Sequence, residues 1–429
     1  MISIQSIQDK KAIIAIIGLG YVGLPLAVEF AMQGFFVIGV DNDEEKIRAL
    51  LEGRNYIQDV EDVTLLELVS KGRLQAQKGY ASLVDADIVI ICVPTPLKKT
   101  REPDMAYIIE AVEGIAEHVS KDCLVVLEST TYPRTTEEVI APILEEQRSH
   151  FYVAFSPERI DPGNPQFKIK NIPKIVGGLD EKSQELAVYL YQQIVETVVP
   201  VSSPRVAETA KLLENTFRTV NIGLINEIAL MCNSMDIDIW EVIDAAATKP
   251  FGFMPFYPGP GLGGHCLPVD PLYLAWKAKF HNFETRFIHL ASEVNRSMPH
   301  YVVERIANIL NDDCQSLNGA RILVLGVAYK NDVNDLRESP ALDVINILEE
   351  KGVKVSYADP HVPLLDLPKT KLMSIALTPE VIKAFDCVVI VTAHNQFDYE
   401  MIVAHAKAVM DTRNATRGMA LEGKRVYKL

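Results

Sequence analysis

The sequence lacks several features that would assign a protein to a particular class. No apolar run reaches the roughly 18 residues that cross a membrane, and the polar N-terminal segment has no apolar signal core. Acidic residues outnumber basic ones, and the formal charge of -15 argues against a general nucleic-acid binder, which normally carries a basic face. We therefore expect a cytoplasmic protein that binds neither membranes nor nucleic acids.

Cysteine is also sparse, and its spacing is uninformative for metals. The six cysteines form no CxxC pair and no pattern typical of metal ligands. This predicts neither a disulfide framework nor a metal site, and it fits a reducing compartment.

A chain of 429 residues with 48% hydrophobic content is large enough to build more than one core.

The first part of the chain alternates short apolar, β-rich runs with helical segments. This alternation is typical of parallel sheets covered by helices, and near-continuous apolar runs suit strands that are buried on both faces. We expect a helix at residues 24–33 and strands at 12–17, 35–40, 88–93, 124–127, 151–155, 174–177 and 198–201.

The pattern becomes helical after residue 202. Ser203 followed by Pro204 is a strong helix start signal, and residues 206–235 keep helical periodicity without a proline. Further helices are expected at 239–247, 286–296, 300–310 and 339–351, and strands return at 321–326, 353–358, 387–392 and 408–410. The predicted fold is α/β, with two Rossmann-like doubly wound lobes joined by a long central helix and a helical middle domain. The predicted domains are 1–202, 203–316 and 317–429.

A glycine-rich turn follows the first predicted strand. Gly18, Gly20 and Gly23 have the GxGxxG spacing that lets a pyrophosphate approach the amides at a helix N-terminus. Asp41 ends the next strand, where a carboxylate accepts hydrogen bonds from an adenosine ribose and repels a 2′-phosphate. This context predicts NAD rather than NADP, and a turn without a ligand is the alternative. The C-terminal lobe has one glycine, Gly326, at the corresponding turn, which leaves that lobe for another ligand.

Glycine and proline are densest around Cys266. Such a loop can hold a cysteine as an attacking thiolate, whereas a buried small hydrophobe is the commoner role of this residue type; the sequence leaves both open. Lys211 and Asn215 share a helix face, which is either solvated or directed into a cleft to stabilise an oxyanion. Tyr273 and Lys277 have the spacing of short-chain dehydrogenases, but they lie outside the cofactor lobe, so we do not predict a catalytic pair.

Taken in order, these motifs resemble the UDP-glucose/GDP-mannose dehydrogenase family along essentially the whole chain. Residues 248–252 (TKPFG) and 257–266 look like the bacterial members that act on UDP-N-acetylglucosamine for surface-polysaccharide synthesis, and an arginine typical of UDP-glucose enzymes in this region is missing. The matching motifs are GLGYVGLP (18–25), CVPTP (92–96), ESTTYP (128–133), SPERIDPG (156–163), KLLEN (211–215), GLGGHC (261–266), YK (329–330), RESP (337–340) and DTR (411–413).

The resemblance implies a four-electron oxidation of the sugar C6 alcohol to a carboxylate, with NAD as hydride acceptor. Cys266 would form a thiohemiacetal and then a thioester that water hydrolyses. Lys211 and Asn215 would stabilise negative charge on the sugar oxygen. Asp270 would hold a proton-accepting water with Thr130, and Glu158 would assist hydrolysis.

The resemblance also implies the binding residues. The long helix would form the core of a homodimer or higher homo-oligomer. The implied NAD contacts are Gly18, Gly20, Tyr21, Val22, Gly23, Asp41, Lys46, Thr95 and Arg337. The implied UDP-sugar contacts are Arg159, Ile160, Tyr257, Gly261, Tyr329, Lys330 and Arg413.

One position departs from the family pattern, because Arg134 follows Thr-Tyr-Pro where glycine is common. We expect its side chain to point to solvent; the alternative is an altered loop, which would affect Thr130.

Other functions are also compatible with parts of the sequence. The same chemistry on UDP-N-acetylgalactosamine or UDP-glucose is the nearest alternative. An NAD-requiring epimerase or dehydratase, or a silent nucleotide-sugar binding protein, fits less well. In a silent protein we would expect Cys266, Lys211 or Asp270 to be replaced, and all three are present.

Overall fold

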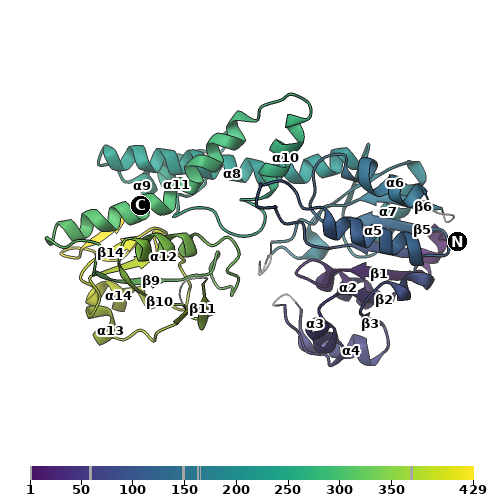
Figure 1. The fold of residues 1–429 in the computed structure, drawn as a ribbon, viewed down its shortest axis with the longest axis horizontal. Coiled ribbons are helices and arrows are strands. Elements are labelled where there is room, and N and C mark those ends of the chain that lie inside the picture. The colour runs from purple at the N-terminus through teal and green to yellow at the C-terminus, as the bar shows by residue number, and fades with distance from the viewer. Residues whose placement is uncertain (1, 58–59, 147–149, 162–163, 165, 368–370) are drawn as a thin grey trace. The chain divides into compact units, whose positions relative to one another are not determined.

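The structure is a computed structural model that describes the chain except residues 1, 58–59, 147–149, 162–163, 165 and 368–370. It divides into two compact units (Figure 1). The N-terminal unit comprises residues up to 214 together with 272–283, and the C-terminal unit comprises 215–271 and 284–429. None of the helices in the described part of the chain is long and apolar enough to cross a membrane.

An eight-stranded sheet forms the centre of the N-terminal unit, with the order β3-β2-β1-β4-β5-β6-β7-β8. The chain moves outward from β1 in one direction and then returns to β4 on its other side, which is the doubly wound arrangement that the sequence predicts. The strands are β1 (Ile13–Ile17), β2 (Phe36–Val40), β3 (Leu74–Gln77), β4 (Ile88–Ile91), β5 (Cys123–Leu127), β6 (Phe151–Phe155), β7 (Lys174–Gly178) and β8 (Val198–Val201).

Helices cover both faces of this sheet. Alternate residues of β1 enter different cores: Ile14 and Ile16 lie in one hydrophobic cluster, and Ala15 and Ile17 in the other. This follows from the two-residue period of a strand. The helices are α1 (Ile4–Gln8), α2 (Gly23–Met32), α3 (Glu44–Leu51), α4 (Asp62–Ser70), α5 (Ala106–His118), α6 (Ala141–Glu145) and α7 (Glu181–Tyr191).

The sheet is not entirely parallel, in contrast to the prediction. β7 pairs with β6 in the antiparallel sense, and β8 then pairs with β7 in parallel. Parallel neighbours need a long crossover, usually a helix, but the described part of the 156–173 connection contains only a short 3-10 turn, Ile169–Asn171. β7 therefore begins at the sheet edge where β6 ends.

Long helices connect the two sheets in sequence. α8 (Pro204–Ser234) begins at Pro204, as predicted, and α9 spans Ile239–Ala247; α10 spans Asp270–Lys279. The two helices expected at 286–296 and 300–310 are one helix, α11 (Arg286–Asn311), with Pro299 inside it. Proline cannot donate to the Asn295 carbonyl. At this point α11 packs against α8, because the buried Asn295 side chain donates to the Thr219 carbonyl of α8 at 3.1 Å.

The C-terminal unit contains a five-stranded parallel sheet with the order β10-β9-β13-β14-β15. The strand β9 (Arg321–Leu325), which lies between β10 and β13, again divides its side chains: Ile322 and Val324 pack with α11 and α12, and Leu323 and Leu325 with α13 and α14. The elements are β9 (Arg321–Leu325), α12 (Pro340–Glu350), β10 (Lys354–Ala358), α13 (Pro379–Lys383), β13 (Cys387–Ile390), α14 (Tyr399–His405), β14 (Val409–Asp411) and β15 (Val426–Lys428), with the hairpin β11 (Leu364–Asp366) and β12 (Lys371–Met373).

Candidate active site

The turn between β1 and α2 contains the predicted glycines, and each has a different role. Gly18 has φ +92°, and a Cβ there would lie 2.6 Å from the Cys92 carbonyl oxygen. A Cβ at Gly23 would overlap the Gly18 carbonyl at 1.8 Å, whereas no atom lies within 4 Å of that position at Gly20. Two glycines therefore close the turn, and the third leaves the backbone open, as the approach of a pyrophosphate requires. The turn fits a dinucleotide.

Asp41 lies just after β2, beside this turn. Its Oδ2 accepts a hydrogen bond from the Leu19 amide at 2.8 Å, and the Lys46 ammonium lies 3.5 Å away. The other oxygen accepts from the Asp43 amide at 2.9 Å. The carboxylate is thereby fixed at the carboxyl edge of the sheet, where a ribose hydroxyl would be bound.

Thr95 and the Tyr273/Lys277 pair lie in the same unit. Thr95 is buried, and its carbonyl accepts a hydrogen bond from the Tyr273 hydroxyl, which is itself fully buried. Lys277 pairs with Glu138. The pair therefore lies in the unit that contains the dinucleotide turn, so the expectation that it lies outside the cofactor lobe is wrong. Both side chains already have partners, and the absence of a catalytic role stays a prediction.

A buried ionic cluster lies at the carboxyl edge of β5 and β6. The Lys174 ammonium, at the start of β7, contacts a carboxylate oxygen of Glu128 at 2.7 Å and one of Glu158 at 3.0 Å. The Tyr191 hydroxyl donates to the other oxygen of Glu128. The antiparallel return of β7 brings this lysine to the edge, because β7 starts where β6 ends.

Two carboxylates share one ammonium in this cluster, and their pKa values are shifted in opposite directions. Burial raises the pKa of Glu128 to about 7, against the attraction of Lys174. Burial also disfavours the charge on Glu158, but Lys174 and two backbone amides hold its pKa below the ordinary value. Those amides, of Arg159 and Ile160, donate to Glu158 Oε1 at 2.6 and 2.7 Å. Glu158 is therefore the ionised member of the cluster.

Lys211 and Arg159 are held beside Glu158. The Lys211 ammonium donates to the Glu158 carbonyl at 2.5 Å, and the Arg159 guanidinium pairs with Glu214 of α8 at 2.8 Å. A small cavity of about 10 Å³, lined in part by Glu158, Arg159, Ile160 and Lys174, has room for no more than one water. The end of the SPERIDPG motif, residues 162–163, lies outside the described residues.

Arg134 adopts a backbone conformation that explains why glycine is common there. Its φ is +77°, in the left-handed region. Glu208 of α8 stabilises the turn by accepting hydrogen bonds from the Arg134 amide at 2.5 Å and from the Thr136 amide at 2.9 Å. The Arg134 side chain is 42% exposed, and its Nε lies 3.1 Å from Glu138. Thr130 is half-buried in the same loop.

The loop before Cys266 is packed tightly within the C-terminal unit. A Cβ at Gly263 would lie 2.7 Å from the Tyr329 Cβ, and one at Gly264 would lie 2.8 Å from the Tyr329 ring. The Gly264 amide also donates to the Arg337 carbonyl at 3.0 Å. Cys266 is exposed, so the interpretation as a buried hydrophobe does not hold.

Polar groups follow Cys266 within one turn. The amide of Asp270, at the start of α10, donates to the Cys266 carbonyl at 2.9 Å. Its buried carboxylate accepts a hydrogen bond from the Asn215 side-chain amide at 2.6 Å. Burial and the Arg337 charge lower the pKa of His265, so the residue beside the thiol is a neutral imidazole at pH 7.

Two further predicted substrate residues, Arg413 and Tyr257, also lie in the C-terminal unit. Arg413 follows β14, its Nε donates to the Val391 carbonyl at 2.8 Å, and burial lowers its pKa to about 10. A Cβ at Gly259 would lie 2.6 Å from the Arg413 guanidinium, so a side chain there would displace that guanidinium. Tyr257 is 48% exposed and stacks on Trp240, with ring centroids 6.0 Å apart.

Comparison with known protein families assigns the chain. The NAD binding domain, the central domain and the UDP binding domain of the UDP-glucose/GDP-mannose dehydrogenases match residues 12–195, 205–297 and 323–418, in that order. The chain belongs to this dehydrogenase family. Its α/β fold, its NAD cofactor and its class, an NAD-dependent UDP-sugar dehydrogenase, are thereby confirmed.

Individual relatives of the dehydrogenase differ in the sugar they are named for. The chain is 36% identical over 396 residues to a UDP-N-acetyl-D-glucosamine 6-dehydrogenase of Pseudomonas aeruginosa, covering 91% of this chain and 92% of the relative. It is 34% identical over 414 residues to a UDP-N-acetyl-D-mannosamine dehydrogenase of Methanococcus maripaludis, covering 94% and 92%. The solved structure of the UDP-D-ManNAc dehydrogenase of Pyrococcus horikoshii aligns with a TM-score of 0.87 at 34% identity, covering 97% of this chain and 98% of the other.

The predicted site residues of the dehydrogenase fall into two groups. The N-terminal unit contains Gly18, Gly20, Tyr21, Val22, Gly23, Asp41, Lys46, Thr95, Thr130, Glu158, Arg159, Ile160 and Lys211. The C-terminal unit contains Asn215, Tyr257, Gly261, Cys266, Asp270, Tyr329, Lys330, Arg337 and Arg413. Within each group the direct contacts described above join several members, but their roles in binding and catalysis stay predictions.

Sequence reasoning missed the buried charged residues that hold the predicted ones. Lys174, Glu128 and Glu208 had no assigned role, and neither did Asp359 and His394 of the C-terminal unit. A signal was available, because a lysine at the start of an apolar strand and a glutamate at the end of one are unusual in a buried sheet and normally need a partner.

Proposed function

We propose that this dehydrogenase oxidises the C6 alcohol of a UDP-N-acetylhexosamine to the carboxylate, with UDP-N-acetylglucosamine as the substrate and Cys266 as the covalent nucleophile. One observation carries the proposal: an exposed thiol ends a glycine segment that packs against Tyr329, and a hydrogen-bonded Asp270–Asn215 pair follows within one turn. An exposed, conformationally fixed cysteine suits nucleophilic catalysis better than packing.

Cys266 is needed because the same carbon must be oxidised twice. NAD, when bound, supplies the hydride acceptor for both oxidations. After the first, the Cys266 sulfur adds to the aldehyde carbon and gives a thiohemiacetal, which keeps the aldehyde from escaping. Loss of the second hydride and the hydroxyl proton gives a thioester, and water then releases the acid and the thiol.

The neighbouring groups have proposed roles in proton transfer and charge stabilisation. Lys211 and Asn215 stabilise negative charge on the sugar oxygen, and Asp270, with Thr130, holds the water that accepts the proton. Both oxygens of the Glu158 carboxylate already accept hydrogen bonds. We therefore assign Glu158 to orienting the hydrolytic water, since its lowered pKa makes it a weak base.

The N-acetyl group is favoured by the relatives, and two sugars remain in competition. The P. aeruginosa relative is named for UDP-N-acetyl-D-glucosamine, whereas the M. maripaludis and P. horikoshii relatives are named for N-acetylmannosamine. UDP-N-acetylmannosamine is therefore the second candidate substrate. UDP-N-acetylgalactosamine and UDP-glucose complete the panel to be tested. Supply of a surface-polysaccharide precursor, in the cytoplasm, is the biological role that we infer.

We also propose a homodimer formed through α8. Several large apolar side chains on this helix are exposed and recur at intervals that place them along one side of it, which is typical of a helix packing partner. They are Leu213, Phe217, Leu224 and Met231. We propose separately that the chain has three domains, with boundaries at residues 202 and 316.

A direct assay of NADH formation tests the reaction. With each UDP-sugar in turn, NADH formed per sugar consumed should approach about two, because both oxidations occur at one carbon; a ratio near one, or a product that mass spectrometry identifies as the aldehyde, would contradict the thioester route. Cys266→Ser should bind NAD normally and form no acid. Cys314→Ser is the matched control, because Cys314 is the other exposed cysteine, and it should keep wild-type turnover.

A further inference from the structure

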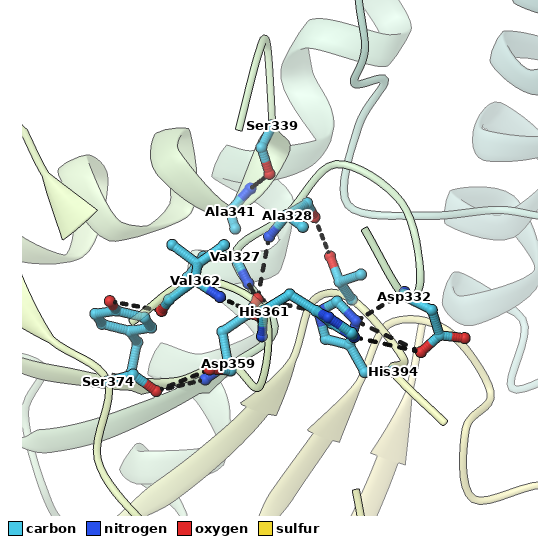
Figure 2. Close-up of polar contacts among 12 residues, drawn as sticks. Val327, Ala328, Asp332, Ser339, Ala341, Asp359, His361, Val362, Ser374 and His394 are labelled. Carbon is cyan, nitrogen blue, oxygen red and sulfur yellow. Dashed lines mark hydrogen bonds and ion pairs between the residues drawn. The ribbon is translucent and has the colours of Figure 1, made fainter. Parts of the chain in front are cut away.

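The loop after β9 contains Tyr329 and Lys330, and side chains from elsewhere in the C-terminal unit hold it on both sides of these two residues. Figure 2 shows Asp359 beside Val327 and Ala328, and His394 beside Asp332. Asp359, just after β10, accepts hydrogen bonds from the Val327 amide at 2.7 Å and from the Ala328 amide at 3.3 Å. The Thr392 hydroxyl donates to the Ala328 carbonyl at 2.6 Å. These contacts fix the start of the loop, on the N-terminal side of Tyr329.

His394 fixes the loop on the other side of Lys330. The histidine is fully buried, and its Nδ1 lies 2.9 Å from the Asp332 amide nitrogen. Because a backbone amide only donates, Nδ1 must be the accepting nitrogen. The hydrogen of the neutral ring is then on Nε2, which lies 3.0 Å from Asp359 Oδ2 and donates to it. Figure 2 shows the ring between the two aspartates.

Asp332 needs such an anchor because its backbone is strained. Its φ is +60°, in the left-handed region that non-glycine residues rarely adopt. The amide bonds to His394, and the carboxylate accepts hydrogen bonds from Asn395, including one from its backbone amide at 2.9 Å. Two consecutive residues after β13 therefore hold one strained residue just beyond Tyr329 and Lys330.

A metal ion is a less suitable explanation for this cluster. Oxygen or nitrogen atoms of Asp332, His361 and His394 lie within 4.8 Å of one another, as metal ligands would. However, the His394 nitrogen that faces Asp332 already accepts the amide hydrogen, and its other nitrogen donates to Asp359. An ion would have to break the hydrogen bond that holds the strained loop.

We propose that His394 is a positioning residue, which acts through Asp332 to hold Tyr329 and Lys330 in the conformation that binds the nucleotide sugar. The inference depends on the proposed function and on the expectation, implied by the family resemblance, that those two residues contact the UDP-sugar. The same loop supports the glycine segment before Cys266, since Gly263 and Gly264 pack against Tyr329. Loosening the loop should lower the population of the binding-competent form, which raises the apparent dissociation constant by the same factor.

Two substitutions by amide side chains distinguish the contributions of the two ring nitrogens of His394. In His394→Asn the amide oxygen can replace Nδ1 as the acceptor, whereas in His394→Gln the amide nitrogen can replace Nε2 as the donor to Asp359 and the acceptor is lost. We expect His394→Gln to raise the KM for the UDP-sugar about tenfold, with kcat and the KM for NAD within about twofold of wild type. His394→Asn should restore most of the affinity.

His361→Gln is the matched control. The His361 ring packs beside His394, with centroids 5.0 Å apart. Its Nε2 lies 3.8 Å from Asp332 Oδ1, too far for a hydrogen bond, and has no hydrogen-bond partner among the described residues. This variant should leave both KM values unchanged. If it behaves like His394→Gln, or if chelation by EDTA weakens the wild-type enzyme, the inference is wrong.

Hydrogen exchange gives a readout that does not depend on turnover. Peptides covering 327–332 should exchange faster in His394→Gln than in wild type and be protected again by UDP, which is the probe ligand. Asn395→Ala tests the same anchor from an exposed position and should change exchange and KM in the same direction, even if the buried variant folds poorly. Unchanged exchange and KM in both would overturn the inference, whereas failure of UDP to bind the wild-type protein would refute the proposed function instead.

Discussion

Replacement of Lys174 by methionine should destabilise the N-terminal unit by an amount that grows with pH. Methionine has a similar length and no charge, so it removes the ammonium between Glu128 and Glu158 and fills much of its space. The side chains of Lys174 and Glu128 are 7% and 0% exposed. Removing one partner of a buried ion pair commonly costs about 3–5 kcal/mol, because the other charge is left without compensation.

Protonation limits this cost at low pH. Glu158 keeps two backbone donors and stays ionised, whereas Glu128 keeps only the Tyr191 hydroxyl. The pKa of Glu128, already about 7 by burial, must rise further when the ammonium is lost. Above pH 7 the folded variant then binds a proton that the unfolded chain does not. Its stability falls relative to wild type by up to about 1.4 kcal/mol per pH unit.

We expect a loss near 3 kcal/mol at pH 8 and a clearly smaller one at pH 6. A chain of this size need not unfold in one step, so the assay is urea-dependent hydrogen exchange of peptides in β5 and β7. The control is Lys174→Met combined with Glu128→Gln, which leaves no buried carboxylate without a cation beside Tyr191. The double variant should recover about 2 kcal/mol at pH 8 and lose the pH dependence. A loss in Lys174→Met below 1 kcal/mol at pH 8, or no recovery in the double variant, would refute the reasoning.

Three further predictions concern the N-terminal unit. Glycine is normally less stable than alanine in a folded chain, but at position 134 the order should reverse by about 1 kcal/mol, because φ is +77°; thermal unfolding of Arg134→Gly and Arg134→Ala compares them, and the ordinary order would count against strain. Burial raises the pKa of Glu208 from 4.5 to about 7, so the folded state retains a proton that the unfolded state loses, and stability falls as pH rises between about 5 and 7. Glu208→Gln should reduce the slope of the unfolding free energy with pH by up to roughly 1.4 kcal/mol per pH unit. Melting temperatures measured at a series of pH values should then change less with pH, and an unchanged slope would exclude Glu208 as its source. Asp41→Ala should weaken NAD binding about 10- to 100-fold through lost charged hydrogen bonds and leave UDP binding unchanged in calorimetry; equal loss of both ligands would mean that the two lobes are misassigned.

The sequence predicted those elements whose signal is local. Apolar runs located β6 and β8 to the residue, and Ser203-Pro204 located the start of α8, because strand burial and helix capping depend on neighbours in the chain. It missed α5 and α7, and it divided α11 at Pro299. A proline favours the end of an isolated helix, but α11 continues through Pro299 in a part of the helix that packs against α8 through Asn295.

The glycines of the site were also within reach of the sequence. Gly18, Gly23, Gly263 and Gly264 stand where a Cβ would collide with backbone or with a nearby side chain. A steric requirement of this kind allows glycine only, so it can be recognised in the sequence itself. The buried residues Lys174 and His394 leave no steric mark of this kind. A lysine at the start of an apolar strand indicates that a partner exists, but it does not identify that partner.

The sequence by itself thus determined the α/β architecture, the dinucleotide turn and the glycine-walled cysteine loop, since each depends on local periodicity or on the absence of a side chain. Only the tertiary structure decided which buried polar groups meet. Lys174 reaches Glu128 because β7 runs antiparallel to β6, and His394 reaches Asp332 because β13 lies beside β9. Strand order and direction are properties of the whole sheet, so partners 46 and 62 residues apart become neighbours only when every strand is in place.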